Sequence, residues 1–262
     1  MTPAQAHLVE QLRARFGASV ALTDPADIAP WLTDWRGRWT GVSAAILQPG
    51  STDEVAALVS LAAELSVALV PQGGNTSMVG GATPPADGSA LIVSLRRMKK
   101  IRAIETGHAV AEAGVILETL HHAAVETGQR FPLTLGSRGS ATIGGLTSTN
   151  AGGTQVLRFG TMRGLVEGLE AVLPDGRVHH GLAGLKKDNR GPSLDQLLIG
   201  AEGILGIVTA VRLALVPAIH ERAVAWLGLA SPDDALALAR DAGDAATVDW
   251  VGQRDLAILL LL

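Results

Sequence analysis

A run of glycine and small polar residues, PQGGNTSMVGG at positions 71–81, directly follows a predicted buried strand. Glycines allow consecutive backbone N–H groups to point into one concavity, and such a concavity binds phosphate without positive side chains. Asn75, Thr76 and Ser77 would add side-chain donors. The run contains neither the Gly-Lys-Ser/Thr of a P-loop nor a G-x-G-x-x-G that opens a helix. It predicts a diphosphate-binding loop of another type, with a tight surface turn as the alternative.

A second glycine-dense run begins with LGSRGSATIGG at positions 135–145 and continues through TNAGG at 149–153. Residues 132–164 show little periodicity, and long structureless stretches inside a compact domain are more often functional than decorative. Two such loops could hold one extended cofactor from both sides. We therefore expect both runs to line the same site.

A third run, LIGAEGILGIVT, covers positions 198–209. Its glycines would let the backbone pass close to a flat ligand, while Ile207 and Val208 begin a strand. The alternative for this run alone is a buried turn before a strand.

Histidines and cations outside these runs are expected on the surface. The adjacent pairs at 121–122 and 179–180 point in different directions, whereas a metal site needs several converging ligands. The cations of the segment RRMKK at 96–100 could attract an anionic acid, but a solvated face is the expectation. Three tryptophans between positions 31 and 39 are expected in core or interface contacts rather than in a flavin stack.

The first half of the chain reads as a strand–helix–strand unit. Residues 44–48 and 68–70 are short apolar strands, and apolar residues from Val55 to Leu65 repeat at helical spacing. Ser51 and Glu54 have the spacing of a capping box at the start of that helix. This order favours a right-handed crossover onto a parallel pair of strands.

The remaining elements follow from apolar patterns and turn signals. Helices are expected near the N-terminus and over residues 115–127 and 231–240. Strands are expected over residues 90–94, 99–104, 109–112, 165–173, 206–215 and 223–229.

Composition excludes several classes of protein. The 262 residues are 47% hydrophobic and 18% charged, which allows a real core and argues against disorder. A formal net charge of -4 without a basic tract argues against a nucleic-acid partner. There is no cysteine, so disulfides and thiolate chemistry are excluded. The N-terminus lacks a signal-peptide pattern, and the final apolar run LAILLLL is far shorter than the roughly 20 residues of a membrane span. We expect a cytoplasmic chain without a membrane span.

Taken together, four segments resemble the vanillyl-alcohol-oxidase-type fold of the FAD-linked oxidases. They are PQGGNTSMVGG at 71–81, TIGGLTSTNAGG at 142–153, GLVEGLEAVLPDG at 164–176 and KDNRGPSLDQLLIGAEGILGIVT at 187–209. The resemblance runs in order over residues 31–219 and is greatest to D-2-hydroxyglutarate, D-lactate and glycolate dehydrogenases. It implies an α+β class: a two-subdomain FAD-binding fold (PCMH type) with a short, truncated start of the substrate domain.

By position, the resemblance implies three groups of cofactor-binding residues. Those that would cradle the FAD diphosphate are Gln72, Gly73, Gly74, Asn75, Thr76 and Ser77. Those that would line its other side and approach the flavin are Gly136, Ser137, Thr142, Gly144, Gly145, Thr149, Asn150 and Gly153. Those that would meet the cofactor from the third run are Glu202, Gly203 and Ile207.

Departures from the family pattern qualify the implied chemistry. Some relatives tether flavin through a histidine where this sequence has Asn75, so FAD is expected to be bound non-covalently. Ile204 replaces a usual threonine of the third run. The family's substrate arginine and metal-binding His-x-Gly-Asp-x-Asn segment would lie beyond residue 262, so no catalytic base and no metal ligand are assigned.

The expected organisation is an N-terminal helical segment (1–40), an FAD-binding domain (41–219) and an incomplete start of a substrate or cap domain (220–262). The implied activity is an FAD-dependent oxidation of a small 2-hydroxy acid, with hydride passing to flavin N5. Two alternatives stay open: an inert FAD-binding fragment, or an FAD subunit that needs a partner chain. The electron acceptor is not specified by the sequence, and a homodimer is left open.

Overall fold

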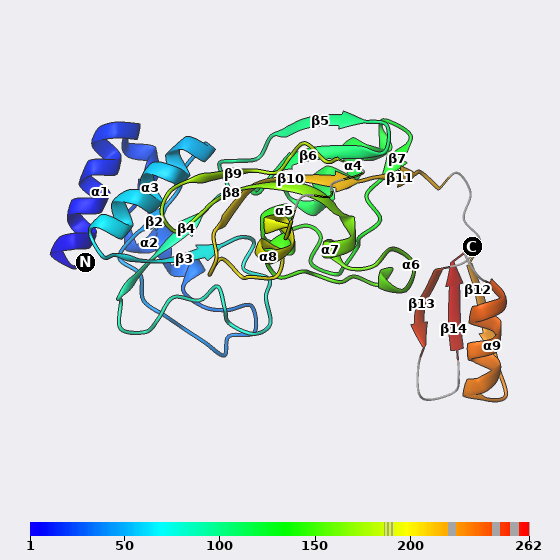
Figure 1. The fold of residues 1–262 in the computed structure, drawn as a ribbon. Coiled ribbons are helices and arrows are strands. Elements are labelled where there is room, and N and C mark those ends of the chain that lie inside the picture. Colours follow the sequence, from blue (N-terminus) through cyan, green and yellow to red (C-terminus); the bar gives the residue numbers. More distant parts are fainter. Residues whose placement is uncertain are drawn as a thin grey trace.

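The structure is a computed structural model that describes residues 1–185, 187, 189, 191–219, 224–242, 247–251 and 257–261 (Figure 1). Two sheets with their helices form most of this part of the chain, and a small unit of three strands and a helix follows them. Within the described residues no helix has the length and apolar character needed to cross a bilayer.

The first sheet has the strand order β1-β2-β4-β3. Its strands are β1 (Ala21–Leu22), β2 (Ile46–Leu47), β3 (Ala68–Gln72) and β4 (Ala90–Ser94). β2 and β3 both run parallel to β4, which lies between them, while β1 is antiparallel to β2. The predicted parallel orientation of β2 and β3 is confirmed, but their direct pairing was wrong because the fully buried β4 takes the central position.

Helices α1 (Pro3–Phe16) and α3 (Thr52–Glu64) cover this sheet and begin at side-chain caps (Figure 1). The hydroxyl of Ser51 accepts a bond from the backbone N–H of Glu54 at 3.2 Å, as expected. The Glu54 carboxylate accepts from Gly50 N at 2.7 Å rather than from the cap residue itself. Residues of α1 and β1 belong to the same hydrophobic core as α3, and the expected boundary after residue 40 stays a prediction.

The second sheet is antiparallel throughout, in the order β5-β6-β10-β8-β9. Its strands are β5 (Ile101–Glu105), β6 (His108–Glu112), β8 (Val166–Val172), β9 (Val178–His180) and β10 (Ile207–Ala214). The turn predicted at positions 174–176 joins β8 to β9, with Gly176 at a positive φ of 82°. β10 therefore forms the centre of this sheet although it is the last of the five strands in sequence.

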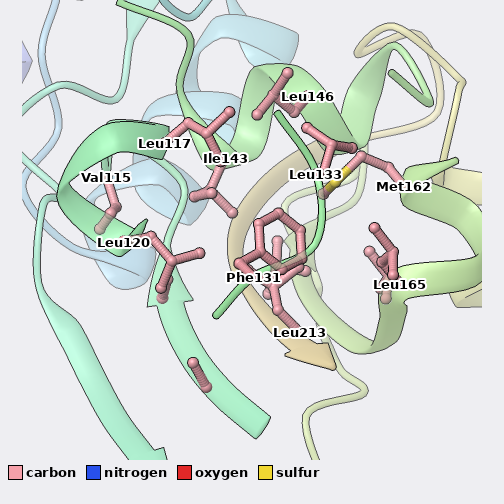
Figure 2. Packing of buried hydrophobic residues seen from close by; sticks show 14 of the residues in the cluster. Val115, Leu117, Leu120, Phe131, Leu133, Ile143, Leu146, Met162, Leu165 and Leu213 are labelled. Atoms are coloured by element: carbon pink, nitrogen blue, oxygen red, sulfur yellow. The ribbon is translucent and has the colours of Figure 1, made fainter. Parts of the chain in front are cut away.

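The core under the second sheet is aliphatic, with one phenylalanine at its middle (Figure 2). Helix α4 (Leu117–Val125) contributes Leu117 and Leu120, which are fully buried beside Phe131 and Ile143. The low aromatic content of the sequence is thus reflected in a core built from leucine, isoleucine, valine and alanine.

A buried carboxylate connects the two layers. Glu170 on β8 accepts hydrogen bonds from Thr52 at the start of α3 (2.6 Å), Thr209 on β10 (2.9 Å) and Arg102 on β5 (3.2 Å). Arg102 also pairs with Glu112 at 3.3 Å. These bonds hold the pKa of Glu170 below its ordinary value even though burial alone would raise it.

Residues 132–164 are not structureless, and that expectation was wrong. They contain α5 (Ile143–Ser148) and α6 (Val156–Phe159), and α7 (Met162–Leu165) follows to the end of the region. α5 forms despite two glycines because Thr142 caps it and because Gly144 lies against Ala113. An ideal Cβ on Gly144 would stand 2.6 Å from the Cβ of Ala113, so only glycine permits this packing.

The C-terminal described residues form a sheet in the order β12-β14-β13, with helix α9. Their bounds are β12 (Val224–Gly228), α9 (Pro232–Ala242), β13 (Thr247–Val251) and β14 (Ala257–Leu261). The predicted helix and strand are present here, although Ala223 lies outside the described residues. The assignment of 220–262 to an incomplete further domain stays a prediction. Residues 220–223, 243–246, 252–256 and 262 of that range lie outside the described residues.

Short elements complete the chain. They are η1 (Ala18–Val20), α2 (Pro25–Ile28), η2 (Ala29–Trp31), β7 (Gln129–Arg130), α8 (Leu194–Leu198) and β11 (Val216–Pro217), which pairs with β7.

Candidate cofactor site

A cavity of about 660 Å³ lies where the three glycine-dense runs meet. Its walls come from both layers, since Val93 of β4 and Ile207 and Val208 of β10 line it. Fourteen of the expected cofactor-binding residues line it as well: Gln72, Gly73, Gly74, Asn75, Thr76, Ser77, Ser137, Thr142, Gly144, Gly145, Thr149, Glu202, Gly203 and Ile207. The structure therefore brings together residues that are up to 135 positions apart in the sequence.

The first two runs touch through their backbones. An ideal Cβ on Gly74 would overlap the carbonyl oxygen of Ser140, and one on Gly73 would stand 2.5 Å from Thr142 Oγ1. These glycines are required for the close approach of the two loops, whatever ligand is bound. As expected, the two glycine-rich loops lie against each other and line the same cavity.

The first loop offers a row of unbonded donors. Among the described residues, none accepts a hydrogen bond from the backbone N–H groups of Gly74, Asn75, Thr76 and Ser77. Backbone N–H groups are normally paired, with protein or with water. Consecutive donors of this kind at a cavity wall fit the oxygen atoms of a diphosphate.

Three of the expected residues have backbone conformations that non-glycine residues rarely adopt. Asn75, Asn150 and Glu202 have φ values of 53°, 47° and 51°, and in the described chain Ser66 alone among other non-glycine residues shares this feature. Strain of this kind concentrates at functional sites when the surroundings enforce it. The side chain of Asn75 does so by donating to the Thr33 carbonyl at 2.8 Å.

The buried side chain of Gln72 ties the start of the first loop to two neighbouring segments. Its side chain is 97% buried, since 3% of its surface is exposed, and its amide nitrogen donates to the carbonyls of Trp31 (3.0 Å) and Ala82 (2.9 Å). Its amide oxygen has no partner among the described residues and is itself fully covered. These two bonds fix the start of the loop, and the expected contact of Gln72 with a diphosphate stays a prediction.

Three expected residues do not line the cavity. Asn150 Oδ1 instead accepts from the backbone N–H of Arg163 at 2.9 Å, and the Arg163 guanidinium donates to the carbonyls of Gln196 and Ile199, both at 2.5 Å. Gly153 packs against the Thr134 carbonyl, and Gly136 faces open space. Asn150 therefore anchors the third run, which begins at 198, without contacting the cavity.

The third run closes the cavity from the side of the first loop. Gly203 has a φ of 84° and lies against Pro71, with Pro71 Cγ 2.8 Å from its ideal Cβ. Glu202 donates its backbone N–H to Ser148 at 2.9 Å, and an ideal Cβ on Gly81 would stand 2.9 Å from its carboxylate. Glu202 is the only carboxylate among the cavity-lining residues of the described chain.

Sequence reasoning missed two cavity cations and one aromatic. Arg96 and Lys99 were expected on a solvated face and Trp31 in the core, yet all three line the cavity. For Arg96 and Lys99 the available signal was their position directly after β4, since ligands gather at the carboxyl ends of parallel strands. Trp35 and Trp39, also expected in contacts, are 63% and 60% exposed.

Histidine positions also differ in part from the expectation of an exposed surface. His121 is half-buried, with Nε2 2.8 Å from the Leu133 carbonyl, and burial lowers its pKa. His179 pairs with Asp195 at 2.6 Å outside the cavity. In the described part of the chain, no three histidine, aspartate or glutamate side chains gather as metal ligands would.

Comparison with known proteins shows which sequences and structures this chain resembles. Residues 43–181, more than half of the chain, match the model of the family described as FAD binding domain. The mitochondrial D-2-hydroxyglutarate dehydrogenase of Bos taurus is 44% identical over 209 residues, which cover 79% of this chain and 38% of that protein. A putative mitochondrial D-lactate dehydrogenase of Schizosaccharomyces pombe is 38% identical and covers 82% and 41%.

A solved structure supports the architecture independently. Alkyldihydroxyacetonephosphate synthase superposes with a TM-score of 0.74 at 21% identity, over 84% of this chain and 42% of its own. At that identity the likeness concerns the fold alone. The chain spans about two fifths of the length of the curated relatives it matches. By sequence and by fold, the chain belongs to the FAD-binding-domain family and is related to the D-2-hydroxyglutarate and D-lactate dehydrogenases.

Proposed function

We propose that this chain binds FAD non-covalently in the cavity described above and forms the flavin-binding part of a 2-hydroxy-acid dehydrogenase. The observation that carries the proposal is the unbonded row of N–H groups from Gly74 to Ser77, which lies against the second glycine run in one cavity. Membership of the FAD-binding-domain family supports FAD as the occupant.

The residues present fit this cofactor. The diphosphate would accept bonds from the N–H groups of the first loop, with the hydroxyls of Thr76, Ser77 and Ser137 as further donors at the wall. Gly144 and Gly145 would let a flat ring approach the backbone of α5, opposite Ile207 and Val208. These 262 residues contain no cysteine, and Asn75 stands where some relatives have a tethering histidine, which supports non-covalent binding.

When bound, FAD supplies a hydride acceptor for the α-carbon of a 2-hydroxy acid. The chain's own contribution is to bind the cofactor, to orient it between the two layers and to cover it with apolar side chains such as Val93 and Leu146. The substrate class is proposed from the names of the relatives, which are a D-2-hydroxyglutarate and a D-lactate dehydrogenase.

A second candidate is an FAD-binding unit that has no turnover unless a further part of the protein, or a partner chain, supplies the substrate groups. It is favoured by the cavity wall, which in the described chain contains no histidine and the single carboxylate of Glu202. The relatives also contain more than half of their length outside the matched region.

A visible absorption spectrum of the purified 262-residue chain tests both candidates. Flavin bands that move to the supernatant on acid precipitation would establish non-covalent FAD. Bleaching by D-2-hydroxyglutarate or D-lactate, but not by the L-isomers as matched controls, would establish the dehydrogenase. Bands that no hydroxy acid bleaches would favour the binding unit. A folded protein that stays colourless after incubation with FAD would refute the central proposal.

A further inference from the structure

Two neighbouring arginines after β4 have different surroundings. Arg97 donates to the Gln48 carbonyl at 2.7 Å and lies 3.7 Å from the Glu54 carboxylate, outside the cavity. Arg96 lines the cavity, and within the described chain it has neither a carboxylate within 4.0 Å nor a hydrogen-bond acceptor. Arg97 therefore serves the fold, whereas the guanidinium N–H groups of Arg96 are available to a ligand.

Arg96 is held in place by an aromatic ring. Its guanidinium carbon lies 3.6 Å from the centre of the Trp31 ring, a distance typical of a stacked cation–π pair. Stacking occupies the faces of the guanidinium and leaves its edge, where the N–H groups are, free to donate. Partial burial in this position lowers the pKa of Arg96, and an arginine nevertheless stays charged at neutral pH.

The stack is coupled to the first glycine loop. The carbonyl of Trp31 accepts from the Gln72 amide at 3.0 Å, and Gln72 directly precedes the loop that presents the unbonded N–H groups. Trp31 thus contacts both Arg96, through its ring, and the residue that precedes the loop, through its carbonyl. The cavity-lining side chains of the described residues include two cations, Arg96 and Lys99, against the one carboxylate of Glu202, so the wall attracts anions.

We propose that Arg96, oriented by Trp31, binds an anionic oxygen of the FAD diphosphate and adds a charged contact to the backbone N–H groups of residues 74–77. This inference rests on the proposed function. A guanidinium donates charge-assisted bonds to phosphate oxygens, and such bonds are stronger than those from neutral amides. The ionic contact makes FAD affinity dependent on salt concentration, whereas a backbone cradle alone would be less sensitive to it.

The test uses the full chain freed of flavin and titrated with FAD, with binding followed by the change in flavin fluorescence. Three variants are compared with the unchanged protein: Arg96→Gln, Arg96→Lys and Lys100→Gln. Lys100→Gln is the matched control, because it removes the same charge from the same segment at a residue that does not line the cavity. Riboflavin, which lacks the diphosphate, is titrated in parallel.

We expect Arg96→Gln to weaken FAD binding about 10-fold at 50 mM NaCl, and about 3-fold at 300 mM NaCl. Arg96→Lys should recover part of the loss, and Lys100→Gln should bind FAD like the unchanged protein. Riboflavin affinity should be the same in all four proteins. Far-UV circular dichroism and thermal unfolding without flavin should also agree, because within the described residues Arg96 makes no hydrogen bond or ion pair that the substitution would break, and only the stack on Trp31 is lost.

Unchanged FAD affinity in Arg96→Gln would overturn the inference while leaving the proposed function intact. The same result together with a lost spectral response of bound flavin to D-2-hydroxyglutarate would overturn it in favour of a contact with the substrate carboxylate. An equal loss for FAD and riboflavin would overturn it too, since the residue would then act on the isoalloxazine end. If the unchanged protein binds no FAD, the proposed function itself fails.

Discussion

Gly74 lies so close to Ser140 that a methyl group on Gly74 would overlap the main-chain carbonyl oxygen of Ser140. The obstacle is backbone, which cannot rotate aside as a flexible side chain would. This contact fixes the first glycine loop against the second. Gly74 thereby differs from glycines such as Gly136, where a methyl group would meet no other atom.

Gly74→Ala should therefore abolish FAD retention and lower the thermal stability of the chain, because the two loops must separate. Gly136→Ala is the matched control: its ideal Cβ meets nothing within 4 Å and its φ is not in the left-handed region. The absorbance ratio of flavin to protein and the midpoint of thermal unfolding measure both effects. Full FAD occupancy in Gly74→Ala would contradict the loop contact.

Asn75 combines a left-handed backbone with a side-chain bond to Thr33. Asn75→Ala should weaken FAD binding about 10-fold, since alanine loses the bond and disfavours this backbone by roughly 1–2 kcal/mol. Asn75→Gly should lose less, because glycine adopts the conformation freely. Fluorescence titration with FAD measures the affinities of the two variants and shows which of them binds more weakly. Ser66→Ala, a change at a left-handed residue away from the cavity, should alter stability without altering affinity.

The buried carboxylate of Glu170 makes stability dependent on pH. Its pKa in the folded chain is lowered by hydrogen bonds from Thr52, Arg102 and Thr209, against the opposing effect of burial. A lowered pKa stabilises the fold above the unfolded value of about 4.5, and that stability is lost as pH falls through the folded value. The free energy of unfolding in urea should thus decrease below about pH 4.5.

Glu170→Gln should reduce this pH dependence and cost about 2 kcal/mol at pH 7, since it replaces a charge-assisted network. Glu167→Gln on the same strand is the control. Its ion pair with Arg212 is partly exposed, so a change of under about 0.5 kcal/mol is expected. An unaltered pH profile in Glu170→Gln would show that another group is responsible.

Arg163 acts on the site without lining it. Arg163→Leu leaves the carbonyls of Gln196 and Ile199 unpaired at the base of the third run, so it should weaken FAD binding severalfold. Arg158→Leu on α6, whose guanidinium only approaches the Phe159 ring, should have little effect. Calorimetric titration distinguishes the two, and equal affinities would contradict an anchoring role.

Much of the fold could be predicted because the relevant signals are local. β4 is an uninterrupted apolar run, and the predicted residues 90–94 are those observed. Ser51 marks the start of α3 through its own hydroxyl, and the turn at 174–176 follows from proline, aspartate and glycine. The position of β4 between β2 and β3 was missed, since strand order depends on pairings between distant segments.

The site could be predicted from its glycines but not from its charges. Gly73 and Gly74 mark a close backbone approach that the sequence displays directly. The sequence gives no reason to treat Arg96 and Arg97 differently. The tertiary structure places Arg96 at the cavity and Arg97 beside Glu54. α5 was missed for a related reason: its glycines disfavour a helix locally, and the helix forms because Gly144 fits against Ala113.

The central place of β10 has a consequence for the order of events during synthesis. The hairpins β5–β6 and β8–β9 emerge from the ribosome first, each with an edge that residues 207–214 pair in the folded chain. Until then both edges are open to pairing with other chains. Because Ile207 and Val208 also line the cavity, its wall is complete only after β10 has left the exit tunnel.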